Sequence, residues 1–104
     1  MLIYLTMIDT PEEKDRFEVI YSKYRYLMLH VAGRILQNHH DAEDAVHEAF
    51  VAIIHNIGKI HDVESPKTRS LVVLIVERKA IDVLRKKQRE NLIEINEYIL
   101  GIEM

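Results

Sequence analysis

Apolar residues recur at three- and four-residue steps over the first third of the chain. The stripe runs through Phe17, Ile20, Tyr21, Tyr24, Leu27, Met28, Val31 and Ile35. This spacing predicts one amphipathic helix whose apolar side faces a core. The helix should begin at "TPEE" (10–13), where Thr10 can cap, Pro11 suits the first helical position and Glu13 completes a capping box. It should end in "QNHHD" (37–41), with Asn38 in the left-handed conformation.

A second helix is predicted from about Asp41 to Ile57, with Gly58 placed to end it. Its buried side comprises Ala42, Ala45, Val46, Ala49, Phe50, Ile53 and Ile57. Its opposite side comprises Glu43, Asp44, His47, Glu48, Val51 and His55. Carboxylates near the start of a helix also match the positive end of its dipole, so a solvated helix start is the simplest interpretation of the acidic residues.

A third helix is predicted after the loop "KIHDVESPKTRS", with Ser65 as cap and Pro66 in the first turn. The run "LVVLIV" (71–76) has the composition of a buried strand, but it continues into "ERKAIDVLRKKQRE" without a turn signal. We therefore expect a helix that is buried on most sides at its start and basic in its second half. The tail "NLIEINEYILGIEM" should form a weak fourth helix or begin a linker.

Together these elements predict an all-α fold, a compact three- to four-helix bundle. A length of 104 residues suits a single domain, which we assign to residues 1–90, with residues 91–104 as a tail or the start of an interdomain linker. The chain is 48% hydrophobic and 30% charged, as in globular proteins, and no apolar run reaches the roughly 18 residues of a membrane span. It has no cysteine and does not begin like a signal peptide, so we expect a soluble, cytoplasmic protein.

The net charge of −3 conceals a strong asymmetry. Residues 67–89 hold eight basic side chains against Glu77 and Asp82, a balance of +6, so the rest of the chain sums to −9. An acidic body with one basic segment suits a protein that meets a polyanion along one edge and a basic partner elsewhere. A solvated, charged helix end explains the basic segment equally well.

The histidines raise one possible enzymatic function, that of a metal-dependent hydrolase. "HHD" (39–41) is similar to the histidine-aspartate pair of HD-type metal-dependent phosphohydrolases, and His30 and Asp82 would have to supply the further ligands. The chain is short for that fold, and polar residues cap helices at such boundaries anyway. No glycine-rich phosphate loop or nucleophile elbow is present. We expect no enzyme, no cofactor and no metal.

Two motifs that follow one another along the chain resemble motifs of one known protein family. "DAEDAVHEAF" (41–50) resembles the region 2 helix of extracytoplasmic-function (ECF) sigma factors, which usually reads D-A-E-D-x-x-Q-E-x-F. "TRSLVVLIVERKAIDVLRKK" (68–87) resembles the partner motif of the same region, R-A-W-L-x-x-I-A-R-N-x-A-I-D-x-L-R-R. With the first helix included, the resemblance covers roughly residues 12 to 89.

The resemblance implies a helical bundle that binds core RNA polymerase and recognises and melts the promoter −10 element. The acidic helix would dock on the clamp helices of the largest polymerase subunits. Asp44 and Glu48 would pair with basic groups there, His47 takes the place of the usual glutamine, and Val51 adds an apolar contact. The resemblance also allows an anti-sigma factor as a partner, and it implies a location with the nucleoid.

The loop and the third helix would face DNA. The residues implied for phosphates and for unpaired bases of the nontemplate strand are Lys67, Arg69, Arg78, Lys79, Arg85 and Lys86. Family members select bases by extruding them into pockets near the loop, here about Lys59 to Arg69. Leu71 stands where the family commonly has tryptophan, Glu77 where it often has arginine, and Arg78 where it often has asparagine, so the promoter preference is not carried over. Asp82 has a structural interpretation, as a partner of Arg78 or Arg85.

Sigma factors of this type normally carry a second helical domain that reads the −35 element by a helix-turn-helix, and nothing after Glu90 supplies one. We therefore expect a fragment or a region-2-only protein. An alternative is a sigma-like regulator that binds polymerase without directing initiation alone.

Overall fold

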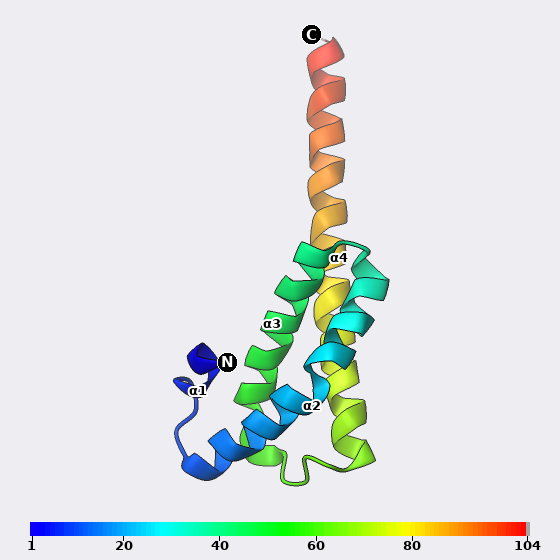
Figure 1. The fold of residues 1–104 in the computed structure, drawn as a ribbon. Helices are drawn as coiled ribbons and strands as arrows, with labels where there is room; N and C mark the ends of the chain where they lie inside the picture. The colour runs from blue at the N-terminus through cyan, green and yellow to red at the C-terminus, as the bar shows by residue number, and fades with distance from the viewer. Residues whose placement is uncertain (104) are drawn as a thin grey trace.

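Three long helices make up most of the computed structural model, which describes residues 1–103 (Figure 1). The elements in chain order are α1 (Leu2–Leu5), α2 (Pro11–Leu36), α3 (His39–His55), the short 3₁₀ helix η1 (Ile57–Lys59) and α4 (Pro66–Glu103). No strand occurs in this range. The predicted all-α class is confirmed.

The start of α2 is the predicted one. The Thr10 hydroxyl accepts a hydrogen bond of 3.2 Å from the backbone N–H of Glu13, and Pro11 is the first helical residue. This cap satisfies one of the backbone N–H groups that the first turn leaves unpaired.

The turn between α2 and α3 differs from the prediction. Gln37, not Asn38, takes the left-handed conformation (φ 55°), and its N–H donates to the carbonyl of Gly33. Asn38 is extended, and its side-chain oxygen accepts from the N–H of Asp41 at 3.0 Å. Because Asn38 serves as an N-cap, α3 begins at His39, two residues earlier than predicted.

The end of α3 was also predicted wrongly. The helix stops at His55, and Asn56 follows in a non-helical conformation with its side-chain amide donating to the carbonyl of Ala52 at 2.8 Å. Gly58 lies within η1 and has a negative φ. The turn therefore uses the asparagine side chain and not the conformational freedom of glycine.

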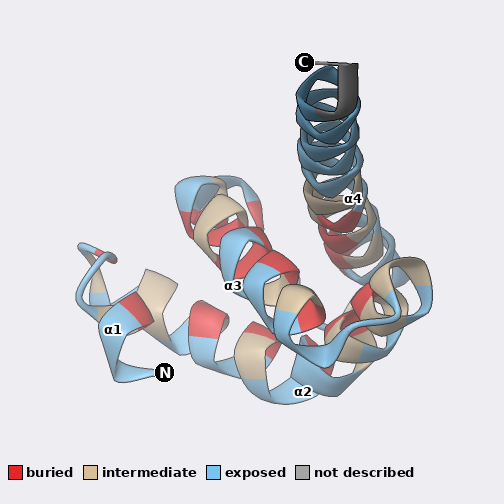
Figure 2. Cartoon of the chain, turned by 90° about the horizontal axis from the view of Figure 1, so that it is seen from above, coloured by how far each residue is buried: buried red, intermediate tan, exposed pale blue. Residues whose placement is uncertain are grey.

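The core lies where α2, α3 and α4 meet, and each of these helices packs on the other two (Figure 2). Phe17 and Phe50 are fully or almost fully buried, with ring centroids 5.7 Å apart in an edge-on arrangement. Ile20, Met28 and Ile53 complete the largest buried side chains of α2 and α3. The predicted apolar sides of both helices therefore face the core. The half-buried members at its margin are Val46 on α3 and Tyr21, Leu27, Val31 and Ile35 on α2.

The N-terminal segment contributes to the core without having been predicted to do so. Tyr4 of α1 is 8% exposed, and its ring lies 5.5 Å from Phe17 and 5.4 Å from Phe50. Ile8, in the link to α2, is buried as well. A four-residue helix carries too little periodicity to be read from the sequence.

The first half of α4 is less buried than predicted. Val72 and Val76 are inaccessible, but Leu71 and Leu74 are 36% and 42% exposed. A helix that packs against two neighbours buries only one side, so the apolar residues on its other side remain at the surface.

Beyond Lys87, which contacts Asp41 of α3, α4 continues as a single-helix extension. No residue after Ala80 is buried within the described range, and every side chain from Arg85 to Gly101 is exposed. The tail does not form a separate fourth helix, because α4 continues without a break to Glu103. The molecule is accordingly elongated, 62 Å by 25 Å by 20 Å (Figure 1).

Candidate functional site

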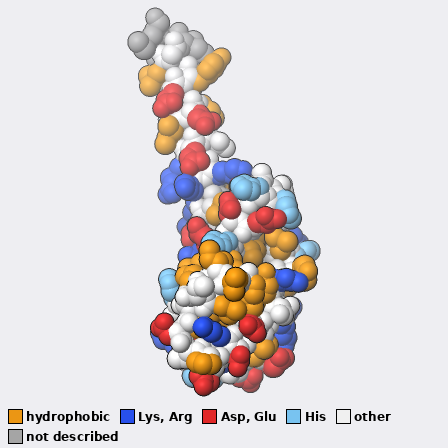
Figure 3. Space-filling view, turned by 60° about the vertical axis from the view of Figure 1, so that its left-hand side comes forward, with side chains coloured by type: hydrophobic (Ala, Val, Ile, Leu, Met, Phe, Trp, Pro, Cys, Tyr) orange, Lys and Arg blue, Asp and Glu red, His pale blue; other side chains and the backbone are white. Residues whose placement is uncertain are grey.

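The acidic residues of α3 occupy its solvent side. Asp44, His47 and Glu48 lie toward solvent and Val51 is half-buried, whereas Ala45 and the other buried alanines of this helix line the core. We call Asp44, His47, Glu48 and Val51 the α3 edge. In Figure 3, acidic and histidine side chains lie beside a Lys and Arg cluster at the base of the protruding helix.

His47 is positioned by α1. The Tyr4 hydroxyl lies 2.8 Å from Nδ1 of His47, and the two rings are 5.4 Å apart. Burial, and secondarily the neighbouring Tyr21, raise the pKa of the Tyr4 hydroxyl, which therefore stays protonated. The hydrogen bond between the Tyr4 hydroxyl and Nδ1 holds the His47 ring against α1. No signal in the sequence linked residue 4 to residue 47.

Each side chain of the histidine-aspartate cluster at the start of α3 lies close to an oppositely chargeable neighbour. Asp41 pairs with Lys87, which ties the start of α3 to α4. His39 lies 2.6 Å from Glu43 and His40 lies 3.7 Å from Asp44, all on the surface of the same helix. Among residues 1–103 no group of three or more metal-ligating side chains comes together. The described residues therefore do not form the metal site that the phosphohydrolase hypothesis requires.

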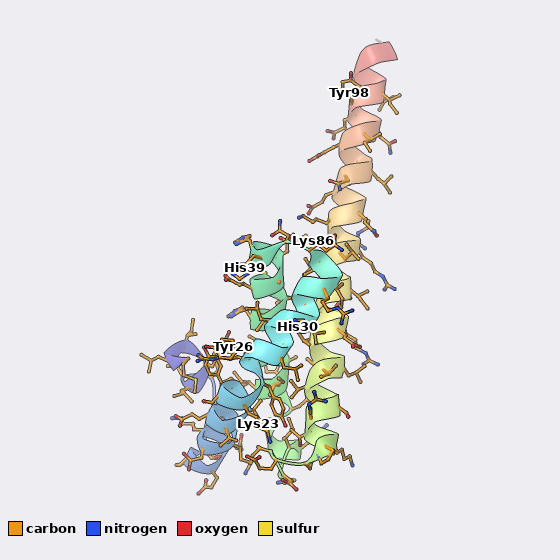
Figure 4. All side chains as sticks on the ribbon, turned by 45° about the vertical axis from the view of Figure 1, so that its right-hand side comes forward. Lys23, Tyr26, His30, His39, Lys86 and Tyr98 are labelled. Carbon is orange, nitrogen blue, oxygen red and sulfur yellow. The ribbon has the colours of Figure 1, made fainter. Side chains whose placement is uncertain are left out.

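Two of the predicted DNA-binding residues lie next to the α3 edge. Lys79 lines a hollow of about 390 Å³ together with His47, Glu48 and Val51. Lys86 lines a second hollow, of about 250 Å³, with Asp44 and Glu48. Figure 4 shows Lys86 at the same end of the bundle as His39, the first residue of α3. The acidic edge and part of the basic segment therefore meet at the seam between α3 and α4.

The other predicted DNA-binding residues lie away from that seam. Three of them, Lys67, Arg78 and Arg85, lie on the solvent side of α4. Alternating steps of four and three residues place them in one row with three aliphatic residues. We call this row the outward stripe: Lys67, Leu71, Leu74, Arg78, Ile81 and Arg85. At 1.5 Å per residue the stripe spans roughly 27 Å. Arg69 is also exposed but lies off this stripe, in the first turn. The aliphatic members of the stripe were not identified from the sequence, which suggested burial.

Hydrogen bonds among its own polar groups stabilise the loop before α4. The Thr68 hydroxyl donates to the carbonyl of Asp62 at 2.6 Å, and the N–H of Thr68 donates to the Ser65 hydroxyl, which caps the helix as predicted. Beside this network lies a hollow of about 200 Å³ lined by residues that include Lys59, Lys67 and Leu71. It falls within the segment from which a base pocket was expected.

Within residues 1–103, none of the helices combines the length and the apolarity needed to cross a bilayer. No curated protein and no solved structure is similar enough to the chain to give a match. The model of one family, sigma-70 region 2, matches residues 20–90 and so includes α3, the loop and the basic half of α4. Since that range is well over half of the sequence, the chain belongs to the sigma-70 region 2 family, a non-enzymatic domain of transcription initiation factors.

Proposed function

We propose that the chain is region 2 of an ECF-type sigma factor, which binds core RNA polymerase and recognises and melts the promoter −10 element. The observation that carries this proposal is the family match over residues 20–90, together with an exposed acidic edge on the helix of the matching motif. Such a domain would work with the nucleoid in the cytoplasm.

The α3 edge is suited to a basic helical partner such as the polymerase clamp. Asp44 and Glu48 lie one turn apart on the same side of α3, with exposed carboxylates. Val51 adds an apolar contact one turn further, beside a hollow of about 390 Å³ that can receive a side chain. The Tyr4 hydrogen bond fixes the His47 ring, so less side-chain freedom is lost on binding.

The outward stripe is suited to single-stranded DNA. Arg78 and Arg85 supply positive charge for phosphates, and the exposed aliphatic side chains of the stripe offer apolar surface to unstacked bases. The loop hollow lies at the start of the same stripe and shares Lys67 and Leu71 with it. A single DNA strand bound along α4 would therefore contact positive charge, apolar surface and the loop hollow.

The direct test is a binding titration of the chain with bacterial core RNA polymerase, followed by transcription from a −10-dependent template. We expect saturable binding in the micromolar range or tighter. Binding without any promoter opening would favour the alternative, a sigma-like regulator that does not direct initiation. Absence of binding would contradict the proposal.

Neutralising the outward stripe should weaken binding of a single-stranded nontemplate −10 oligonucleotide. We expect Arg78→Ala with Arg85→Ala to lower affinity about tenfold and to reduce the salt slope by about 0.7 for each phosphate that is no longer neutralised. The measurement is fluorescence anisotropy at several salt concentrations. Arg34→Ala, which removes an exposed arginine from α2, is the control and should change neither quantity. If Arg34→Ala lowered the affinity as much as Arg78→Ala with Arg85→Ala does, DNA binding would not be concentrated on α4.

A further inference from the structure

The basic residues of α4 lie in two rows on different sides of the helix. Lys67, Arg78 and Arg85 belong to the outward stripe. Lys79 and Lys86, which we call the seam lysines, each follow one of these arginines by a single position. Successive residues of an α-helix differ by about 100° around its axis, so the two rows face different directions. Lys79 is half-buried where Arg78 is exposed, which places Lys79 at the edge of the packed side.

The seam lysines lie beside the α3 edge without pairing with it. Lys79 and Glu48 line the hollow of about 390 Å³, and Lys86 lines the hollow of about 250 Å³ with Asp44 and Glu48. The ion pairs described among residues 1–103 include neither seam lysine, and they do not include Glu48. Charges of both signs at this seam are therefore available to a partner.

Single-stranded DNA is a poor occupant of the seam. The charged residues that line the hollow beside Lys86 are four carboxylates and two lysines: Asp41, Asp44, Glu48, Glu90, Lys86 and Lys87. Asp41 and Lys87 pair with each other, which leaves three carboxylates beside one lysine. A phosphate bound to that lysine would also approach the carboxylates, and the repulsion between like charges disfavours it. The outward stripe, by contrast, has no acidic member.

The two charged rows run side by side. α3 and α4 pack on each other in opposite directions, so the order Asp44, Glu48 along α3 lies beside the order Lys86, Lys79 along α4 (Figure 1). The seam lysines are seven residues apart, which is about 10 Å along the helix. A partner helix of about three turns laid along the seam would reach both rows, with one edge over the carboxylates and the other over the lysines.

We propose that Lys79 and Lys86 belong to the polymerase-docking surface and select a polymerase segment that carries both signs of charge. This inference rests on the proposed function, and it reassigns two lysines that the family resemblance implied for DNA. Basic side chains of the segment pair with Asp44 and Glu48, and its carboxylates pair with the seam lysines. A segment with basic residues alone is attracted by α3 and repelled by α4, so the lysines discriminate against it.

The first test neutralises the seam lysines and measures the affinity of the whole chain for core RNA polymerase in the absence of DNA. Lys79→Gln with Lys86→Gln should weaken binding about tenfold, because two contacts with carboxylates are lost. Equal or tighter binding overturns the proposal, since removing lysines that only oppose a basic partner would relieve repulsion. Circular dichroism should give unchanged helicity, and Lys86→Gln alone, at an exposed position, should show part of the loss without any change at the packed side.

The matched variant is Arg78→Gln with Arg85→Gln, which removes two positive charges from the same helix one position away. In a titration of the single-stranded −10 oligonucleotide, this variant should lose affinity and the seam variant should keep most of it. In the polymerase titration the order should be reversed. Equal losses of DNA affinity for the two variants would overturn the proposal and assign the seam lysines to DNA.

Because the chain has no cysteine, single cysteines that carry a photo-crosslinker test the contact directly. Lys86→Cys should cross-link to purified core polymerase, and Arg85→Cys, on the outward stripe, should do so with a much lower yield. Equal yields would overturn the proposal. If the unaltered chain binds polymerase and the seam variant binds equally well, this inference alone fails. If the unaltered chain does not bind, the proposed function fails and the inference fails with it.

Discussion

Replacing Asp44 and Glu48 together by arginine is expected to abolish binding to core RNA polymerase. Both carboxylates are exposed on one side of α3, so their reversal turns attraction for a basic partner into repulsion without disturbing the core. Reversing two charges at the centre of an interface should cost about 3 kcal/mol or more, equivalent to at least a 100-fold loss of affinity. The measurement is a titration of labelled chain with core polymerase at fixed salt.

The matched control is Asp15→Arg with Glu18→Arg, which reverses two exposed carboxylates on α2 and changes the net charge by the same amount. It should retain most of the affinity, and circular dichroism should give the same helicity for both variants. If the α3 variant binds as well as the α2 variant, the docking surface lies elsewhere on the molecule.

Replacing Phe17 by alanine should lower the free energy of unfolding more than any of the surface substitutions does. Its side chain is inaccessible and lies within 5.7 Å, ring to ring, of both Tyr4 and Phe50. Removing a buried phenylalanine costs about 3–5 kcal/mol, which is a large share of the roughly 5–15 kcal/mol that stabilises a typical domain. Urea denaturation followed by circular dichroism gives the change in the free energy of unfolding.

Tyr26→Ala provides the comparison for Phe17→Ala, because Tyr26 is an aromatic residue of the same helix but is 69% exposed. Its replacement should change the free energy of unfolding by about 0.5 kcal/mol or less. A loss below about 1 kcal/mol for Phe17→Ala would show that the three helices do not depend on this aromatic contact.

Periodicity and capping residues predicted the parts of the fold that depend on local sequence. The cap at Thr10, the apolar side of α2 from Phe17 to Met28 and the start of α4 at Pro66 are all as predicted. The motif on α3 predicted a solvent-facing acidic edge, and Asp44 and Glu48 are exposed. Each of these features is encoded within one or two helical turns.

Features that depend on distant residues were not predictable in this way. The contact between Tyr4 and His47 joins segments 43 residues apart, and the Asp41–Lys87 pair joins segments 46 apart. The exposure of Leu74 follows from which side of α4 packs on its neighbours, and the residues of "LVVLIV" do not themselves indicate that side. The hollows shared by α3 and α4 arise only when the helices are assembled.

Arg85 stands where α4 leaves the bundle, because Leu84 is half-buried and every residue from Arg85 to Gly101 is exposed. Since α4 is one unbroken helix across this point, a DNA strand bound along the outward stripe would reach the extension without crossing a turn. There its phosphates would meet the carboxylates of Glu90, Glu94 and Glu97, with no basic side chain among residues 90–101. The charge along this single helix would therefore limit how far the strand can follow it.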